Sequence, residues 1–232
     1  MIPLYDNLPT RRFPVMTVAI IALNVLVFIY ELSLPSERAL SRFFFQAGFV
    51  PFELTHLVDI RPRDIVPPPL TIFTAMFIHG GWLHIGFNML FLWIFGNNVE
   101  DAMGRLRFLV FYFVCGVIAA IAQTASAPGS TVPEIGASGA IAGVLGAYIV
   151  LFPRARVLAL LPLLFFFPIV YVPAWLMIGL WFLLQLASGT LSLGAPASGG
   201  VAYFAHIGGF LAGVVLVPLF ARRRRRAPPL VF

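Results

Sequence analysis

The chain has 232 residues, of which 60% are hydrophobic and only 10% are charged. Soluble domains usually carry about a quarter charged residues, so this composition excludes a soluble globular protein, a disordered chain and a small disulfide scaffold. It predicts an all-α membrane protein with several spanning helices. The net charge of +6 does not indicate a nucleic-acid partner, because five of the fifteen basic residues form one run at 222–226 beside a hydrophobic segment. That run is expected to anchor the membrane edge.

Charge-free runs mark the candidate spans, because a helix needs about 20 residues to cross about 30 Å of hydrocarbon. Prolines at 67–69 break any helix at the start of the run 65–99. Gly, Ser and Ala at 188–200 divide the long run 157–221. The predicted fold is a bundle of six transmembrane helices, at residues 13–30, within 65–99 and ending near Phe95, 108–133, 135–153, about 174–187 and about 202–220.

Proline also shapes the segment 157–173, which contains Pro162, Pro168 and Pro173. We predict an irregular approach along the membrane edge here, before the fifth span. The alternative is that residues 157–171 form a span of their own. That alternative would reverse the orientation of everything that follows.

The arginines orient the six spans, because basic residues favour the cytoplasmic side. Eleven of the fifteen would lie on the side of both termini, and the other four lie in the first loop. Both termini are therefore predicted to be cytoplasmic. The expected organisation is a cytoplasmic tail at 1–14, a membrane domain at 15–221 with a long first outer loop at about 34–70, and a basic cytoplasmic tail at 222–232.

Few strongly polar side chains lie inside the predicted spans, where each is costly and therefore a candidate for function. The candidates stand near the starts of the second, fourth and sixth spans: His79, His84, Asn88, Ser138 and His206. These three spans would all run from outside to inside, so their starts share one face of the membrane. The topology thus predicts a single polar site near the outer surface.

The residue types that are missing narrow the chemistry of this site. Neither His79 nor His84 is followed by Glu, so the zinc motif His-Glu-x-x-His is absent, and no Asp pair stands inside the spans. Ser138 and His206 remain, and an imidazole activates a Ser hydroxyl as a nucleophile by taking its proton. His206 is interpreted as general base and acid. The backbone N–H of Ser138, with the side chains of His84 and Asn88, is expected to stabilise the oxyanion.

Helix packing is the alternative explanation of these residues. Ser138 stands among glycines and alanines at a spacing typical of close helix contacts. His206 with Gly209 and Gly213 fits a tight helix crossing in the same way. Taken singly, each residue favours packing, whereas their convergence on one face favours a site. Glu134 is close to Ser138 in sequence, but it lies in a predicted loop and nothing places it against His206.

Three motifs carry a family resemblance. They are His79-x-x-x-x-His84-x-x-x-Asn88, Gly136-Ala137-Ser138-Gly139-Ala140 and Ala205-His206-x-x-Gly209-x-x-x-Gly213. With them the chain resembles the rhomboid intramembrane serine proteases in their basic six-span prokaryotic form. The resemblance implies a dyad of Ser138 and His206, with His84 and Asn88 assisting the oxyanion, and cleavage of a substrate helix near its outer end. The motif residues expected to support the site are His79, Gly136, Gly139 and Gly209.

Other positions match the family pattern unevenly. Glu100 between Gly96 and Gly104 fits its GxxxExxxG element, which is interpreted as structural. Ala142 stands where members often carry a Tyr that stacks on the catalytic His. No Trp precedes Trp82, so the Trp-Arg pair found in the first loop of some members is absent.

The sequence therefore predicts an intramembrane serine endopeptidase that uses neither a metal nor an organic cofactor. Its expected partners are single-span membrane protein substrates and the lipid bilayer, and its expected location is the inner membrane of a prokaryote, as a multi-pass protein. Two alternatives are weighed against it. One is a catalytically silent relative that binds membrane clients. The other is a small-solute transporter, which should show paired broken helices or intramembrane charges.

Overall fold

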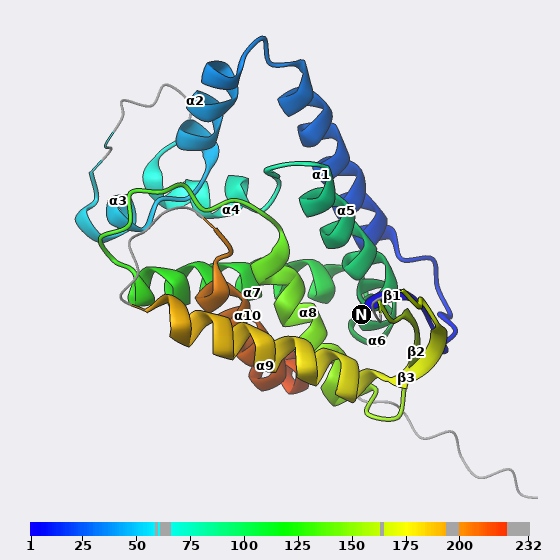
Figure 1. Cartoon of the computed structure of the whole chain (residues 1–232). Coiled ribbons are helices and arrows are strands. Elements are labelled where there is room, and N and C mark those ends of the chain that lie inside the picture. Colours follow the sequence, from blue (N-terminus) through cyan, green and yellow to red (C-terminus); the bar gives the residue numbers. More distant parts are fainter. Residues whose placement is uncertain (59, 61–65, 163–164, 194–199, 222–232) are drawn as a thin grey trace, which may run out of the picture.

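Helices make up most of the structure. The computed structural model describes residues 1–58, 60, 66–162, 165–193 and 200–221. Its helices, drawn in Figure 1, are α1 (Val15–Ser33), α2 (Glu37–Ala47), α3 (Pro51–His56), η1 (Pro68–Leu70), α4 (Thr71–Ala75), α5 (Trp82–Phe91), η2 (Leu92–Gly96), α6 (Asn97–Met103), α7 (Arg105–Ser126), α8 (Ser138–Leu151), α9 (Ala174–Ser192) and α10 (Tyr203–Phe220).

Four helices of the described residues, α1, α7, α9 and α10, are long and apolar enough to cross a membrane. The helix α8 is also apolar but has only 14 residues. The second predicted span continues beyond Phe95, because α5, η2 and α6 follow one another from residue 82 to 103. The chain is a mostly helical membrane protein with four long apolar helices and several shorter ones.

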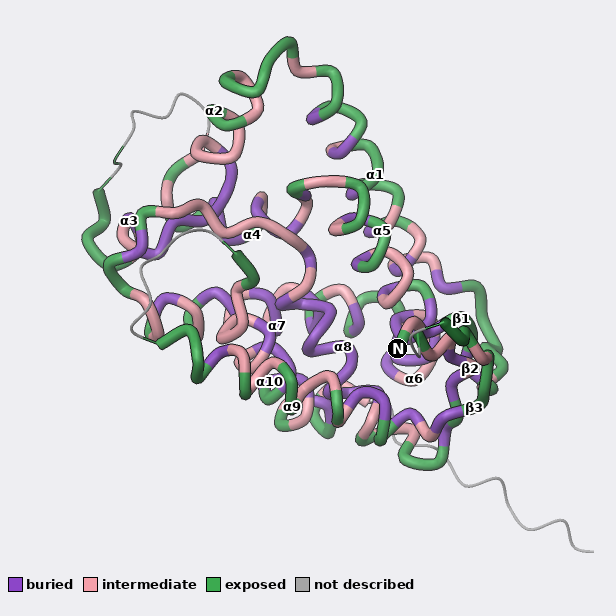
Figure 2. Tube along the Cα trace, in the orientation of Figure 1, coloured by how far each residue is buried: buried purple, intermediate pink, exposed green. Residues whose placement is uncertain are grey.

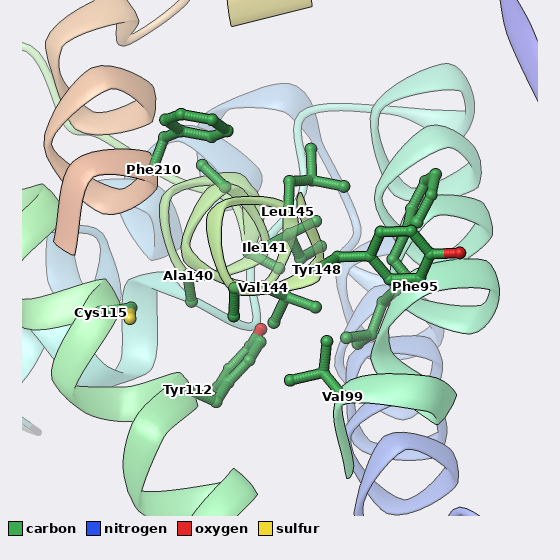
Figure 3. Close-up of a cluster of buried hydrophobic side chains, with 14 of the residues drawn as sticks. Phe95, Val99, Tyr112, Cys115, Ala140, Ile141, Val144, Leu145, Tyr148 and Phe210 are labelled. Carbon is green, nitrogen blue, oxygen red and sulfur yellow. The ribbon is translucent and has the colours of Figure 1, made fainter. Parts of the chain in front are cut away.

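The core of the bundle lies around α8. In Figure 2 the tube of α8 is almost entirely buried, whereas α1 and α9 are largely exposed or half-buried. Figure 3 shows Ile141, Val144 and Tyr148 of α8 among side chains that include Phe95 of η2 and Tyr112 of α7. The short helix is therefore surrounded by protein. The exposed apolar faces of α1 and α9 are suited to contact with lipid.

A small sheet departs from the predicted all-α fold. The strand β1 (Ile2–Asp6) pairs antiparallel with β2 (Arg156–Leu160), and β2 pairs antiparallel with β3 (Ile169–Pro173). The prediction of an all-α protein is therefore wrong in this part of the chain. Residues 157–160 and 169–173 of the segment are therefore strands, neither irregular, as predicted, nor part of a separate helical span, as in the alternative.

The prolines lie at the ends of these strands rather than inside them. Pro162 follows β2, Pro168 precedes β3 and Pro173 is the last residue of β3. A proline at a strand end removes no hydrogen bond from the centre of a sheet. Along β2, the buried residues Val157 and Ala159 alternate with less buried ones. The sequence does not reveal this alternation, because Leu158 and Leu160 are apolar as well.

A buried carboxylate attaches the sheet to the bundle. The Oδ2 atom of Asp6 accepts hydrogen bonds from the Tyr148 hydroxyl at 2.6 Å and from the Asn98 side-chain amide at 2.7 Å. Burial raises the pKa of Asp6, and the hydrogen bond from Tyr148 acts against this rise. Tyr148 belongs to α8, so the first strand of the chain is held to the helix that begins at Ser138.

Glu100 connects α6 to the start of α1. Its carboxylate accepts the backbone N–H of Met16 at 3.0 Å, and the backbone N–H and hydroxyl of Thr17 at 2.8 Å each. The first N–H groups of a helix have no partner within the helix, so Glu100 satisfies two of them. The interpretation of Glu100 as structural is confirmed.

The long loop after α1 contains the short helices α2 and α3. An isolated bridge between Phe49 and Glu134 joins it to the loop before α8. His56, at the end of α3, is exposed. The predictions that involve Arg61, Arg63 and the basic tail at 222–232 lie outside the described residues.

Candidate active site

Ser138 and His206 meet at the starts of two neighbouring helices. Ser138 is the first residue of α8, and His206 lies in the first turn of α10. The Ser138 Oγ atom lies 2.7 Å from the His206 Nε2 atom, which is hydrogen-bonding distance. His206 itself is buried. The structure therefore brings the predicted nucleophile and the predicted base into direct contact.

Glycines let the backbones of α8 and α10 touch below this pair. A Cβ atom on Gly209 would overlap the carbonyl oxygen of Gly139, and one on Gly213 would overlap the carbonyl oxygen of Gly143. Small residues at such positions are typical of close contacts between membrane helices. The packing interpretation of these glycines is therefore confirmed, and this packing is what holds the Ser138 helix against the His206 helix.

The other side of the His206 ring faces α9. The Oε1 atom of Gln185 lies 2.8 Å from the His206 Nδ1 atom. The ring of Trp181 lies 5.8 Å from the His206 ring between centroids, tilted by 37°. Trp181 and Gln185 are four residues apart and thus share one face of α9. The helix α9 therefore provides both an aromatic and a polar neighbour for His206.

His84 of α5 lies over the loop that precedes Ser138. The backbone N–H of Gly80 donates to its Nδ1 atom at 3.3 Å, so in the neutral ring the proton is carried by Nε2. A Cβ atom on Gly136 would lie only 2.7 Å from this Nε2 atom. Gly136 also has a φ of +123°, a conformation that favours glycine. Glycine is thus required at position 136 for two separate reasons.

Asn88 and His79 hold different places in the predicted site. Asn88 is one turn beyond His84 on α5 and donates one amide hydrogen to the His84 carbonyl at 2.9 Å, which leaves a second amide hydrogen for a ligand. The buried His79 does not line the same cavity. Its backbone N–H donates to Glu31 of α1 at 3.2 Å, and its ring meets the ring of His84 edge-on at 5.0 Å. His79 therefore lies beside His84 rather than in the cavity, and its supporting role stays a prediction.

An open cavity of about 950 Å³ joins these groups. Ser138, His206, His84 and Asn88 all line it. Such a volume matches the clefts that bind sizeable ligands. The cavity is also lined by apolar and aromatic side chains, among them Leu83, Phe87, Phe91, Trp181, Tyr203 and Phe204.

Glu134 is bound to Gln123 of α7 rather than to His206. The Gln123 Nε2 atom donates to the Glu134 carboxylate at 3.1 Å. The Gln123 Oε1 atom accepts the backbone N–H of Ala205 at 3.2 Å. Burial raises the pKa of Glu134, and the hydrogen bond from Gln123 opposes the rise. Gln123 thus connects the loop before Ser138 with the residue before His206.

Three residues around the site are not among the predicted ones: Gln185, Trp181 and Gln123. A signal for the two glutamines was available, since each is an amide inside a predicted apolar span and the same criterion selected His206. Within the part of the chain that the structure describes, no group of three or more His, Cys, Asp or Glu side chains is placed to hold a metal ion.

Residues 69–223, more than half of the chain, match the family model of the rhomboid domain. The chain belongs to the rhomboid family. The resemblance inferred from the three motifs is thus confirmed, and this rhomboid is a multi-pass integral membrane protein of the rhomboid membrane protease family. The roles of Ser138, His206, His84 and Asn88 in catalysis stay predictions.

Several known rhomboids are similar in sequence to this one. It is 35% identical over 159 residues to Rhomboid protein 1, mitochondrial, of Saccharomyces cerevisiae, covering 66% of this chain and 42% of the relative. It is 42% identical over 76 residues to Rhomboid protease GluP of Bacillus subtilis, covering 33% and 14%. It is 33% identical over 157 residues to Rhomboid-like protein 11, chloroplastic, of Arabidopsis thaliana, covering 64% and 51%. The matched region is about half or less of each relative.

Proposed function

We propose that this rhomboid is a serine endopeptidase that cleaves peptide bonds in or near the outer ends of substrate transmembrane helices. The observation that carries the proposal is the 2.7 Å contact between Ser138 Oγ and His206 Nε2, in a cavity large enough for an extended peptide segment. A buried polar pair is costly in a membrane protein. The pair lines a cavity that a substrate can enter, which gives these two polar groups a function.

The chemistry proposed is acyl transfer through a Ser–His dyad. His206 Nε2 takes the hydroxyl proton of Ser138 as Oγ attacks the scissile carbonyl carbon, and a tetrahedral oxyanion forms. His206 then gives that proton to the leaving amine, which completes an acyl ester on Ser138. A water molecule from the open cavity, deprotonated by His206, hydrolyses the ester and restores the enzyme.

The oxyanion donors proposed are the backbone N–H of Ser138, the His84 Nε2–H and the Asn88 amide. The N–H groups of the first turn of α8 have no partner within the helix, and the bond from Gly80 leaves the proton of His84 on Nε2. Preorganised donors of this kind stabilise developing charge without reorganisation. The proposal is supported by the fact that Ser138, His84 and Asn88 all line one cavity.

The proposed topology has six spans, formed by α1, by α5 with α6, and by α7, α8, α9 and α10, with both termini in the cytoplasm. Its support is the unequal distribution of arginine between the two sides. The proposed location is the inner membrane of a prokaryote, and the proposed substrates are single-span membrane proteins. A client-binding protein without activity would need neither Ser138 nor His206, so their contact favours the protease.

Cleavage of a single-span reporter protein in proteoliposomes tests the proposal. We expect cleavage by the unmodified chain and a loss of at least about a thousandfold with Ser138→Ala or His206→Ala, as found when nucleophile or base is removed from other serine proteases. The matched control is His56→Ala, which changes an exposed histidine outside the cavity and should leave the rate unchanged. Cleavage by either dyad variant at the unmodified rate would refute the mechanism.

A further inference from the structure

The imidazole of His206 has a second hydrogen-bond partner that the Ser–His dyad leaves unused. Its Nδ1 atom lies 2.8 Å from the side-chain oxygen of Gln185, while its Nε2 atom lies 2.7 Å from Ser138 Oγ. Ser138, His206 and Gln185 thus form a continuous row of hydrogen-bonded groups across α8, α10 and α9. Neither nitrogen of the ring is left without a neighbour.

A neutral imidazole has one N–H and one lone pair, and only one of its two tautomers can act as base toward Ser138. The nitrogen that carries the proton is set by the hydrogen bond at the other nitrogen. An amide oxygen can only accept a hydrogen bond, so Gln185 Oε1 requires the proton on Nδ1. The lone pair is then on Nε2, where it faces the hydroxyl of Ser138.

We infer that Gln185 is a positioning residue that fixes His206 in its base-competent tautomer. This inference rests on the proposed protease function and assigns to α9 a part in it. Gln185 does not touch the reacting atoms. Its amide performs the orienting task that a buried carboxylate performs in Ser-His-Asp enzymes.

The choice of an amide fits the surroundings of α9. An ionised carboxylate inside an apolar span would be costly to bury, whereas a neutral amide is far less so. When His206 takes the proton of Ser138 and becomes cationic, its Nδ1–H to Gln185 becomes a charge-assisted bond, which is stronger than the neutral one. The contact therefore favours the charged state that the reaction passes through.

Trp181 adds a second restraint from the same helix. It stands one turn before Gln185 and its ring lies beside His206. Ala142, where rhomboids often carry a stacking Tyr, is a small buried residue that lines the same cavity. The orientation of His206 thus depends on α9 instead of on a ring carried by α8.

The direct test is the protonation pattern of His206, read by ¹⁵N NMR of the full chain labelled at histidine and held in detergent micelles at a pH where the ring is neutral. The chain has four histidines, so single His→Ala variants assign each signal. We expect the proton on Nδ1 in the unmodified protein and a mixture of tautomers in Gln185→Leu. A proton on Nε2 in the unmodified protein overturns the inference, even if the Leu variant fails to fold.

Cleavage kinetics give the second measurement. Gln185→Leu should lower kcat/KM about tenfold, because it removes the acceptor that holds the proton on Nδ1 and one hydrogen bond is worth about 1 kcal/mol. The matched control is Gln46→Leu, the same change at a half-buried position of α2 outside the cavity. An unchanged rate and tautomer in Gln185→Leu would refute the inference while the proposed protease still cleaved its reporter. Equal cleavage by Ser138→Ala would instead refute the protease itself.

Discussion

Two helices reach His206 in different ways. The helix α8 meets α10 through glycines, so closely that a Cβ atom on Gly209 or Gly213 would overlap a backbone carbonyl oxygen of α8. The helix α9 is mostly exposed or half-buried and approaches His206 through the side chains of Trp181 and Gln185. The first contact sets how far His206 lies from Ser138. The second sets which tautomer and which orientation the ring has. Changes to the glycine contact should therefore damage the fold and the chemistry together, whereas changes to Trp181 or Gln185 should damage the chemistry alone.

The largest expected effect comes from adding one methyl group to the α8–α10 contact. In Gly209→Ala the new Cβ atom overlaps the carbonyl oxygen of Gly139, and the two helices must separate. Overpacking of this kind typically costs about 1–3 kcal/mol, and the distance between Ser138 and His206 should exceed hydrogen-bonding range. We expect a lower thermal unfolding midpoint in detergent and a loss of reporter cleavage.

The matched control is the same substitution on α9. A Cβ atom on Gly179 would meet nothing within 4 Å, and alanine is a better helix former than glycine by up to about 1 kcal/mol. Gly179→Ala should therefore be as stable as the unmodified protein or more so, with unchanged cleavage. If both alanine variants behaved alike, the contrast between the two helix contacts would be wrong.

A smaller effect on cleavage is expected from two buried tyrosines, Tyr148 of α8 and Tyr112 of α7, which differ in one respect. Both side chains are fully buried. The Tyr148 hydroxyl donates to Asp6, whereas the Tyr112 hydroxyl has no hydrogen-bond partner among the described residues. Tyr148→Phe should cost about 1–3 kcal/mol because it removes a donor from a buried carboxylate. Tyr112→Phe, which removes an unpaired polar atom, should be close to neutral.

Unfolding of both variants in chemical denaturant measures this difference. Ser138 lies ten residues from Tyr148 along α8, about 15 Å, so cleavage by folded Tyr148→Phe should stay near that of the unmodified protein. A large loss with Tyr112→Phe would mean that its hydroxyl has a stabilising partner. Equal stability of Tyr148→Phe and the unmodified protein would mean that β1 is not held through Asp6.

Much of the site could be predicted from the sequence, because polar side chains are rare in apolar helices and therefore conspicuous. Ser138, His206, His84 and Asn88 stood out for this reason, and the alternation of helix direction brought them to one end of the bundle. Gln185 meets the same criterion as an amide inside a predicted span, but its partner is distant in sequence and no motif links the two. Only the three-dimensional packing of α9 against α10 connects Gln185 with His206.

The fold was less predictable where all residues are apolar. Hydropathy marks a helix that must cross lipid, but it says little about a helix that is covered by protein. The helix α8 is such a case, because it is surrounded by the other helices and has only 14 residues. In β2 every second residue is buried, but the sequence shows no matching alternation of polar and apolar residues. The carboxylate of Asp6 looks like an ordinary charge in a terminal segment until Tyr148 and Asn98 are placed around it.

The smallest expected effect concerns pH and the loop that carries Ser138. Burial raises the pKa of Glu134 above its ordinary value near 4.5, so the folded protein holds this proton more tightly than the unfolded chain. The stabilising contribution of protonated Glu134 is complete below this ordinary pKa and is lost as the pH rises through the raised pKa of the folded protein.

Glu134→Gln keeps a neutral side chain with an oxygen acceptor for Gln123 at every pH. The difference in thermal midpoint between this variant and the unmodified protein should therefore shift in favour of the variant as the pH is raised from about 4 to 8. A difference that stayed constant over this range would show that the charge on Glu134 costs the fold nothing, and the connection from α7 through Gln123 would then tolerate an ion beside the candidate nucleophile.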